Sequence, residues 1–239
     1  MACKVSYDGT RYHGWQRQDN ALGVQEVIED SLQKLHNGTR VEIHGASRTD
    51  QGVHALGQVF HFDTSLDVPM ERMALAINTY LPEDIFVQSA WMVDATFHAR
   101  KSATQKTYVY KVMIDTYWPH LRNSMGFVKG PLDLKRMQSE LSSVIGTHDF
   151  RALTQHAAYD SYERTVFSAS LTATEQGIEM TITGSGFLRH MVRILMGTLI
   201  MLGQGHPSTM RDILASHNRL NAGLNVAPEG LYLCQVDYD

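Results

Sequence analysis

The chain has 239 residues, of which 43% are hydrophobic and 19% charged, and its formal net charge is −4. This composition is ordinary for a globular protein with one large domain or two smaller ones, and the mildly acidic balance excludes a protein that is basic throughout. The two cysteines, Cys3 and Cys234, form no CxxC motif and cannot make a zinc site alone.

The chain is expected to be cytoplasmic and to have no membrane partner. Its first residues, MACKVSYDGT, contain no apolar signal segment, and two free thiols suit a reducing compartment. The most hydrophobic stretch, Leu188–Leu202, is interrupted by charged residues, so its apolar part is far shorter than the ~20 residues of a membrane span.

Residue patterns in the first half predict strands and helices in alternation. Apolar residues recur at helical spacing in VQEVIEDSLQKL, which predicts a helix over Val24–Leu35. The elements predicted here are a strand at Lys4–Tyr7 ending in the turn Asp8-Gly9, the helix Val24–Leu35, short strands at Val41–Ile43 and Gln58–Phe62 around the loop His44–Gly57, and a helix over Met70–Tyr80 stopped by Leu81-Pro82.

The second half repeats this order of elements. In Tyr108–Ile114 the side chains alternate, so that Tyr108, Tyr110 and Val112 share one face of a strand. The elements predicted after it are a helix over Leu132–Ile145 ending at Gly146, a hairpin of Val166–Thr172 and Ile178–Thr183, helices near Phe187–Leu202 and Thr209–His217, and a strand at Leu231–Val236.

These patterns favour an α+β fold with largely antiparallel sheets over a doubly wound one, because the strands occur as hairpin-like pairs. We expect two domains, 1–104 and 105–239. The turn-rich segment 115–131 is a weaker candidate for the boundary.

The loop His44–Gly57 (HGASRTDQGVHALG) has the composition of a chemical site. Arg48 and Asp50 are two residues apart, so in extended backbone their side chains point the same way. A carboxylate on such a loop suits three roles, those of a nucleophile, a general base or a metal ligand. A turn aspartate beside a surface arginine is the simpler interpretation of the same pattern.

Two other segments are basic and contain no acidic residue. His98–Lys111 contains Arg100, Lys101 and Lys106 beside two tyrosines, which suits phosphates and stacked bases, although a solvated strand edge with core tyrosines has the same pattern. In Gly184–Arg211, Arg189 and Arg193 are four residues apart, which predicts one helix face. A buried arginine needs an acidic partner, for which Asp50 is a candidate; on a surface helix Arg193 would instead extend to water.

Taken together, five ordered segments strongly resemble the TruA family of tRNA pseudouridine synthases. They cover nearly the whole chain: YDGTRYHGWQRQ from Tyr7, SRTDQGVHALGQVFHF from Ser47, FHARKSATQKTYVYKV from Phe97, GFLRHMVRILMG from Gly186 and APEGLYL from Ala227.

The resemblance implies two similar α+β domains, with mainly antiparallel sheets flanked by helices and an active-site cleft between them. It implies conversion of uridine to pseudouridine at positions 38, 39 and 40 of the tRNA anticodon arm. It also implies a homodimer that holds tRNA across both subunits, and no cofactor or metal.

Residue roles follow from the same resemblance. Asp50 matches the family's nucleophile, and Tyr108 the tyrosine that stacks on uracil and serves in proton transfer. Arg193 matches the arginine that pairs with the aspartate. The substrate-binding residues expected are Arg48, which helps displace the base, Leu231 in the uracil pocket, and Arg100, Lys101, Lys106, Phe187 and Arg189. The chain departs from the family pattern at Ser47, where glycine is usual, and at Gln105, Lys106 and Thr107, where basic residues are common.

A mechanism follows from those assignments. The target base must leave the stacked anticodon arm, and Arg193 would keep Asp50 ionised, because a nearby positive charge lowers the pKa of a carboxyl group. Attack of Asp50 on C1′, attack on uracil C6 and proton removal at C2′ all stay open.

Two rival functions fit part of the same residue pattern. A metal-dependent hydrolase would use His44, Asp50, His54 and His61, although their spacing matches no helix-borne ligand motif. A non-catalytic RNA-binding module would have no need of a paired carboxylate near RNA phosphates. A Ser-His-Asp triad of Ser47, His54 and Asp50 is weaker than either, since a nucleophile elbow is lacking.

Overall fold

The computed structural model describes residues 1–155 and 159–239 and shows a mixed α+β fold with mostly antiparallel β-sheet. The chain divides into two compact units. Unit 1 consists of Met1–Thr104 and Tyr232–Asp239, and unit 2 of Gln105–Leu231. The sequence predicts that the last strand belongs to the second domain. In the structure, Tyr232–Asp239, which includes all of that strand except Leu231, belongs to unit 1.

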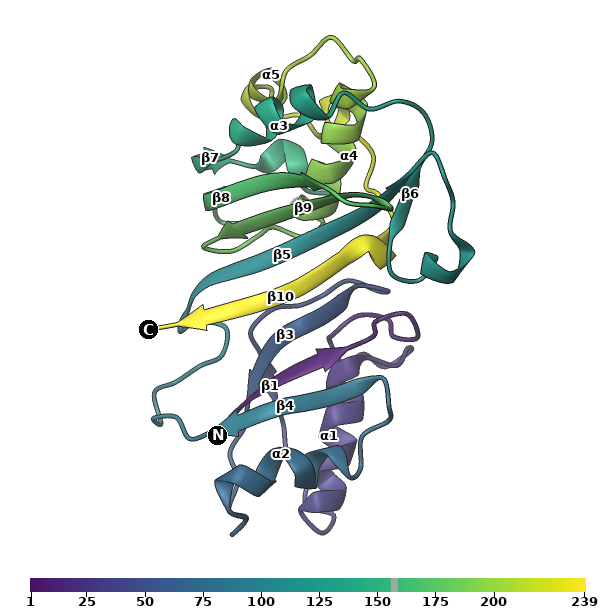
Figure 1. Cartoon of the computed structure of the whole chain (residues 1–239). Helices are drawn as coiled ribbons and strands as arrows, with labels where there is room; N and C mark the ends of the chain where they lie inside the picture. The colour runs from purple at the N-terminus through teal and green to yellow at the C-terminus, as the bar shows by residue number, and fades with distance from the viewer. Residues whose placement is uncertain (156–158) are drawn as a thin grey trace. The chain divides into compact units, whose positions relative to one another are not determined.

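Unit 1 is a sheet in the order β4-β1-β3-β10, with two helices (Figure 1). β1 pairs antiparallel with both β3 and β4, β10 runs parallel to β3, and the short β2 pairs with β3. Helix α2 contacts both β4 and α1. The elements are β1 (Ala2–Tyr7), α1 (Val24–Leu35), β2 (His44–Gly45), β3 (His54–His61), α2 (Met70–Asn78), β4 (Ile85–Trp91) and β10 (Leu231–Tyr238).

Helix α1 has the bounds that its apolar spacing predicts, and it buries Val24, Ile28 and Leu32. The expected strand at Val41–Ile43 is wrong, because side chains of α1 take the backbone groups that a strand would use. The Ile43 N–H donates to Glu29 Oε1 at 3.2 Å, and the Ile43 carbonyl accepts from Gln25 Nε2 at 3.2 Å. Strand pairing therefore begins one residue later, at His44.

This arrangement makes Glu29 a strong determinant of stability. Its carboxylate is 3% exposed and accepts hydrogen bonds from Ile43 N, Gln25 Nε2 and Arg17 Nη1. We expect Glu29→Ala to lower the free energy of unfolding by about 3 kcal/mol, because buried donors lose their acceptor. Chemical denaturation measures the effect. Asp30→Ala, which removes an exposed carboxylate 4.0 Å from Arg17, is the control and should change stability little.

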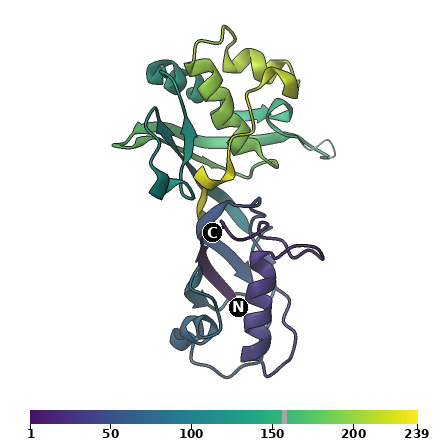
Figure 2. The same cartoon turned by 90° about the vertical axis from the view of Figure 1, so that its right-hand side faces the viewer.

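Unit 2 contains a sheet in the order β5-β9-β8-β7, antiparallel throughout, with β6 parallel to β5. Helix α3 contacts α4, α5 and β8, and the helices gather at the end of this unit drawn at the top of Figures 1 and 2. The elements are β5 (Ala103–Ile114), β6 (Gly126–Val128), α3 (Leu134–Ser142), β7 (Gly146–Asp149), β8 (Glu163–Ala173), β9 (Gly177–Gly184), α4 (Met191–Gly203) and α5 (Met210–Ala215), with short 3-10 turns at Pro119–Leu121, Arg151–Leu153, Arg219–Asn221 and Pro228–Gly230.

The predicted hairpin and the alternation of β5 are confirmed, since Tyr108, Tyr110 and Val112 are all buried. The helix expected to end at Gly146 ends at Ser142 instead, and Gly146, with φ +108°, is the first residue of β7. Strands β4, β6 and β7 were not predicted. No helix among the described residues is long and apolar enough to cross a membrane.

Candidate active site

Asp50 lies half-buried in the turn that leads into β3, and backbone hydrogen bonds fix that turn. The Asp50 carbonyl accepts from Val53 N at 3.1 Å. A second segment braces the turn from the side, because Trp15 N donates to the Thr49 carbonyl at 3.1 Å and Gly52 N donates to the Tyr12 carbonyl at 3.2 Å. The candidate nucleophile is therefore presented by a backbone with little freedom to move.

Two features of the bracing segment were not predicted from the sequence. The Tyr7 and Thr49 hydroxyls form a buried 2.8 Å hydrogen bond across 42 residues of chain. Gly14 has φ +90°, and a Cβ there would lie 2.6 Å from the Thr49 carbonyl oxygen. Only glycine permits the backbone at position 14 to lie this close to Thr49. The glycine of the YHGW segment is therefore the sequence feature that could have indicated the contact with the Asp50 loop.

His54 serves the fold of unit 1. It is 4% exposed, its Nδ1 accepts from Gly9 N at 3.1 Å and lies 3.2 Å from Asp8 Oδ1, and its ring stacks on Tyr232 at 4.7 Å. Among the described residues its buried Nε2 has no hydrogen-bond partner, and no group of three or more His, Cys, Asp or Glu is placed to hold a metal. This geometry supports neither the metal-hydrolase alternative nor a triad through His54.

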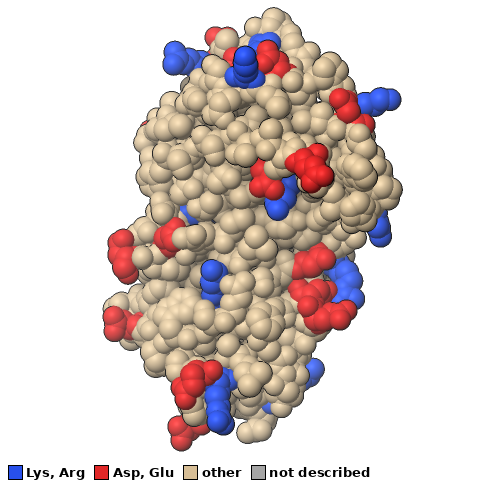
Figure 3. All heavy atoms as spheres, in the orientation of Figure 1, with Lys and Arg blue, Asp and Glu red and all other residues tan. Residues whose placement is uncertain are grey.

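The other candidate cations of unit 1, Arg48, Arg100 and Lys101, are exposed. Arg48 stands in the same turn as Asp50, and Arg100 and Lys101 follow the half-buried His98. On the face drawn in Figure 3, basic side chains are dispersed and several stand beside acidic ones, so among the described residues that face has no continuous basic surface.

In unit 2, Tyr108 of β5 lies against Phe187. Tyr108 is 6% exposed, and the two rings meet edge to face with centroids 5.2 Å apart and planes at 84°. Lys106, two residues earlier on the same strand, is also buried, and it pairs in register with Gly184 of β9. The structure thus brings together one predicted catalytic residue and two predicted substrate-binding residues on neighbouring segments.

Arg189 and Arg193 do not share a helix face, which corrects the sequence prediction. Helix α4 begins only at Met191, because His190 adopts a left-handed conformation with φ +64°. Arg189 therefore lies outside the helix and is exposed, with its N–H bound to the Tyr159 hydroxyl and its carbonyl accepting from Thr154 Oγ1. Of these two arginines, only Arg193 lies in α4, in its first turn.

Arg193 is half-buried, and its Nε donates to the Val226 carbonyl at 2.7 Å. The next residue of that loop, Ala227, accepts a 2.7 Å hydrogen bond from the Tyr110 hydroxyl. Burial raises the pKa of Tyr110 well above its usual range, so this hydroxyl stays protonated as a donor. The two bonds fix the segment that leads into Leu231, which is itself buried.

The same loop lies directly on α4 at Gly197. A Cβ on Gly197 would lie 1.9 Å from the Leu224 carbonyl oxygen, and Gly223 N donates to Thr198 Oγ1 at 3.0 Å. We expect Gly197→Ala to displace the loop and lower the free energy of unfolding by roughly 3 kcal/mol, the cost of overpacking. Thermal or urea unfolding measures it. Gly186→Ala, where nothing lies within 4 Å of the added Cβ, should be close to neutral.

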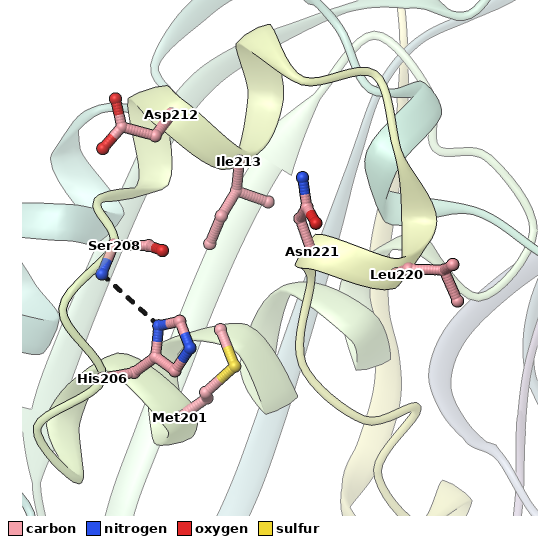
Figure 4. Close-up of a pocket in the computed structure, with 7 residues that line it drawn as sticks. All are labelled: Met201, His206, Ser208, Asp212, Ile213, Leu220 and Asn221. Atoms are coloured by element: carbon pink, nitrogen blue, oxygen red, sulfur yellow. Dashed lines mark hydrogen bonds between the residues drawn. The ribbon is translucent and has the colours of Figure 1, made fainter.

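Unit 2 contains a pocket of about 290 Å³, and within the described structure none of the predicted site residues lines it (Figure 4). Two of its polar side chains form hydrogen bonds with nearby residues of the chain. His206 Nδ1 accepts from Ser208 N, and Asp212 forms a capping box with Thr209 at the start of α5. The pocket residues are Met201, His206, Ser208, Asp212, Ile213, Leu220 and Asn221.

Comparison with known proteins shows similarity over nearly the full chain. A family model described as tRNA pseudouridine synthase matches residues 3–100 and 141–239. The protein named tRNA pseudouridine synthase A of Thermoanaerobacter sp. (strain X514) is 42% identical over 98% of this chain and 97% of its own length. Proteins of the same name from Shouchella clausii (strain KSM-K16) and Staphylococcus aureus (strain bovine RF122 / ET3-1) are 42% and 40% identical over 100% and 99% of this chain, and over 93% and 90% of their own lengths.

Proposed function

The chain belongs to the tRNA pseudouridine synthase family, and from this membership we propose that it isomerises uridines in the anticodon arm of tRNA, at positions 38, 39 and 40. The protein is an isomerase that converts uridine to pseudouridine. The observation that carries the assignment of its nucleophile is the half-buried Asp50 in a turn fixed by backbone hydrogen bonds.

The proposed reaction begins with extrusion of the target uridine from its stack, which costs a few kcal/mol. Arg48, exposed in the same turn as Asp50, is suited to take the vacated space or to bind a phosphate. Tyr108 offers an aromatic ring for the extruded uracil, and its contact with Phe187 fixes the orientation of that ring. Leu231 supplies an apolar surface for the base.

Asp50 then acts on the extruded nucleotide. The glycosidic bond between N1 and C1′ breaks, the uracil turns, and C5 bonds to C1′, so that no atom is gained or lost. Asp50 attacks C1′ or C6, or removes the proton at C2′. We propose, from the family resemblance, that Arg193 is the positively charged partner of this carboxylate. Tyr108 serves in the proton transfer that completes the reaction: C5 gives up its proton, and N1, released from C1′, takes one up.

The position of the modified uridine is tested with tRNA transcripts. Purified protein should form pseudouridine in a transcript with uridine at positions 38, 39 and 40, and none in a transcript with cytidine at all three, as measured by pseudouridine-specific chemical mapping. Pseudouridine elsewhere in the second transcript would contradict the anticodon-arm assignment and leave the isomerase assignment standing.

The tRNA is expected to contact Arg100 and Lys101, both exposed in unit 1. Replacing both with glutamine should weaken tRNA binding and reduce the slope of log affinity against log salt by about two, because each phosphate contact contributes about 0.9. Binding titrations at several salt concentrations measure this. A slope equal to that of the wild-type protein would place the tRNA backbone elsewhere.

The family resemblance also supports a homodimer that holds each tRNA across both subunits. Sedimentation equilibrium should give twice the chain mass of 26.9 kDa. A monomer that is fully active on tRNA would contradict this proposal.

A further inference from the structure

The bracing segment, residues 7–15, is itself held by the carboxylate of Asp84, the residue that directly precedes β4. The Tyr12 hydroxyl donates to Asp84 Oδ1 at 2.6 Å. The Arg11 guanidinium binds Asp84 Oδ2, with Nε at 2.9 Å and Nη2 at 2.6 Å. The Asp84 carbonyl also accepts from Asp8 N at 2.9 Å. One residue outside the bracing segment therefore binds three successive parts of it.

The hydrogen bond from Tyr12 to Asp84 is the buried part of this network. Tyr12 is 3% exposed and the Asp84 side chain 13%, whereas the Arg11 side chain is 69% exposed. Burial, followed by the hydrogen bond to Asp84, raises the pKa of Tyr12 to about 12, so the hydroxyl stays protonated as a donor. Because exposed ion pairs contribute little and hydrogen bonds to a charged acceptor are strong, Tyr12 rather than Arg11 fixes the segment.

Tyr12 connects this anchor to the nucleophile through its backbone. The Tyr12 carbonyl accepts from Gly52 N at 3.2 Å. Gly52, with φ +76°, is the third residue of the four-residue turn Asp50–Val53, which the hydrogen bond from Val53 N to the Asp50 carbonyl closes. The path from the Asp84 carboxylate to the turn thus passes through one buried tyrosine, from its hydroxyl to its carbonyl.

Close backbone contacts leave this path little freedom. Tyr12 N donates to the Gly9 carbonyl at 3.0 Å, and a Cβ on Gly9 would lie 2.0 Å from the Val53 carbonyl oxygen. Because protein interiors are close-packed, a shift of Tyr12 displaces its neighbours instead of being absorbed in a void. A displacement of Tyr12 is therefore passed on to the turn that carries Asp50.

We propose that Asp84 is a positioning residue for Asp50, and that it holds the nucleophile turn in its reactive geometry through the Tyr12 hydroxyl. This inference rests on the proposed function. Catalytic groups have to be held within about 0.5 Å of their productive positions, and a misplacement of about 1 Å costs on the order of 10²-fold in rate. A purely structural role for Asp84 predicts a loss of stability with no change in the rate of the folded protein.

The test is the single-turnover rate at saturating enzyme, with pseudouridine counted over the whole tRNA transcript and tRNA affinity measured separately. We expect Asp84→Ala to lower the rate by on the order of 10²-fold and to leave the dissociation constant within about threefold. Asp84→Asn keeps an oxygen that accepts from Tyr12, because the exposed Arg11 is able to turn to water, and should retain a rate within about threefold of the wild-type protein.

A second variant tests the path through the tyrosine. Tyr12→Phe keeps the ring and removes the hydroxyl, so we expect it to lower the rate by about tenfold or more. The double variant Tyr12→Phe/Asp84→Ala should be no slower than Asp84→Ala alone, because the two side chains act through one hydrogen bond. Losses that multiply in the double variant would overturn the proposal.

Asn78→Ala is the matched control for stability. The Asn78 side chain binds the N–H and the carbonyl of Val87 in β4, at 2.8 and 2.9 Å, so its loss should destabilise unit 1 while the rate stays at the wild-type value. An equal loss of rate in Asn78→Ala would overturn the proposal, as would a wild-type rate in Asp84→Ala. If Asp84→Ala is unfolded by circular dichroism, a wild-type rate in Tyr12→Phe would overturn it. Absence of pseudouridine with the wild-type protein would count against the proposed function instead.

Discussion

Asp50→Asn is expected to abolish pseudouridine formation while leaving tRNA binding within about threefold of the wild-type protein. Asparagine keeps the size of the side chain but removes the charge that makes it a nucleophile or a base. Loss of a nucleophile that no other group replaces costs on the order of 10⁴-fold or more in rate. Single-turnover assays with excess enzyme measure the chemical step, and binding titrations measure affinity separately.

The backbone of the Asp50 turn supports this separation of effects. The hydrogen bonds that fix the turn use backbone groups of Thr49, Asp50 and Gly52, which the substitution leaves in place. Asp63→Asn, at an exposed position of unit 1, is the matched control and should keep full activity. Turnover by Asp50→Asn within tenfold of the wild-type rate would remove Asp50 from the chemistry.

Arg193→Leu is expected to lower the single-turnover rate by on the order of 10²-fold or more and to reduce stability. The substitution leaves the Val226 carbonyl without its donor, which costs about 1–3 kcal/mol. It also removes the positive charge proposed to hold Asp50 ionised.

Tyr110→Phe separates the charge from the structural contact. It removes the neighbouring hydrogen bond to Ala227 and leaves Arg193 in place, so we expect about 1 kcal/mol of lost stability with activity retained. If Tyr110→Phe lost as much activity as Arg193→Leu, fixing the loop would account for both results. A single-turnover rate for Arg193→Leu equal to that of the wild-type protein would contradict the proposed ion pair.

The sequence predicts an element when the residues of that element themselves form a periodic pattern. It does not predict an element whose conformation depends on hydrogen bonds to residues far away in the chain. Helix α1 has an apolar stripe that sets its bounds and its buried face. Residues Val41–Ile43 have strand-forming side chains, but Glu29 and Gln25 from that helix bind the backbone of Ile43. Nothing in the local sequence of those residues reveals such a contact, because it depends on how the helix packs.

The candidate site divides in the same way. The loop with Asp50 was identified from its residue types, and the strand with Tyr108 from its alternation. The brace from Tyr7 to Trp15 was not, because a hydroxyl pair 42 residues apart leaves no periodic pattern. Arg189 and Arg193 have ideal helical spacing, yet the left-handed His190 places the first outside α4. Asn, Asp and His are enriched in this conformation, but only tertiary contacts select the residue that adopts it.

The most direct test of the central claim is a pseudouridine map of total tRNA from cells that lack this protein and carry either the wild-type gene or the Asp50→Asn gene. We predict that pseudouridine at positions 38, 39 and 40 is present with the wild-type gene and absent with the variant, when both proteins accumulate equally. Equal modification in the two strains would contradict the account, because the carboxylate of Asp50 would then not be needed for the reaction.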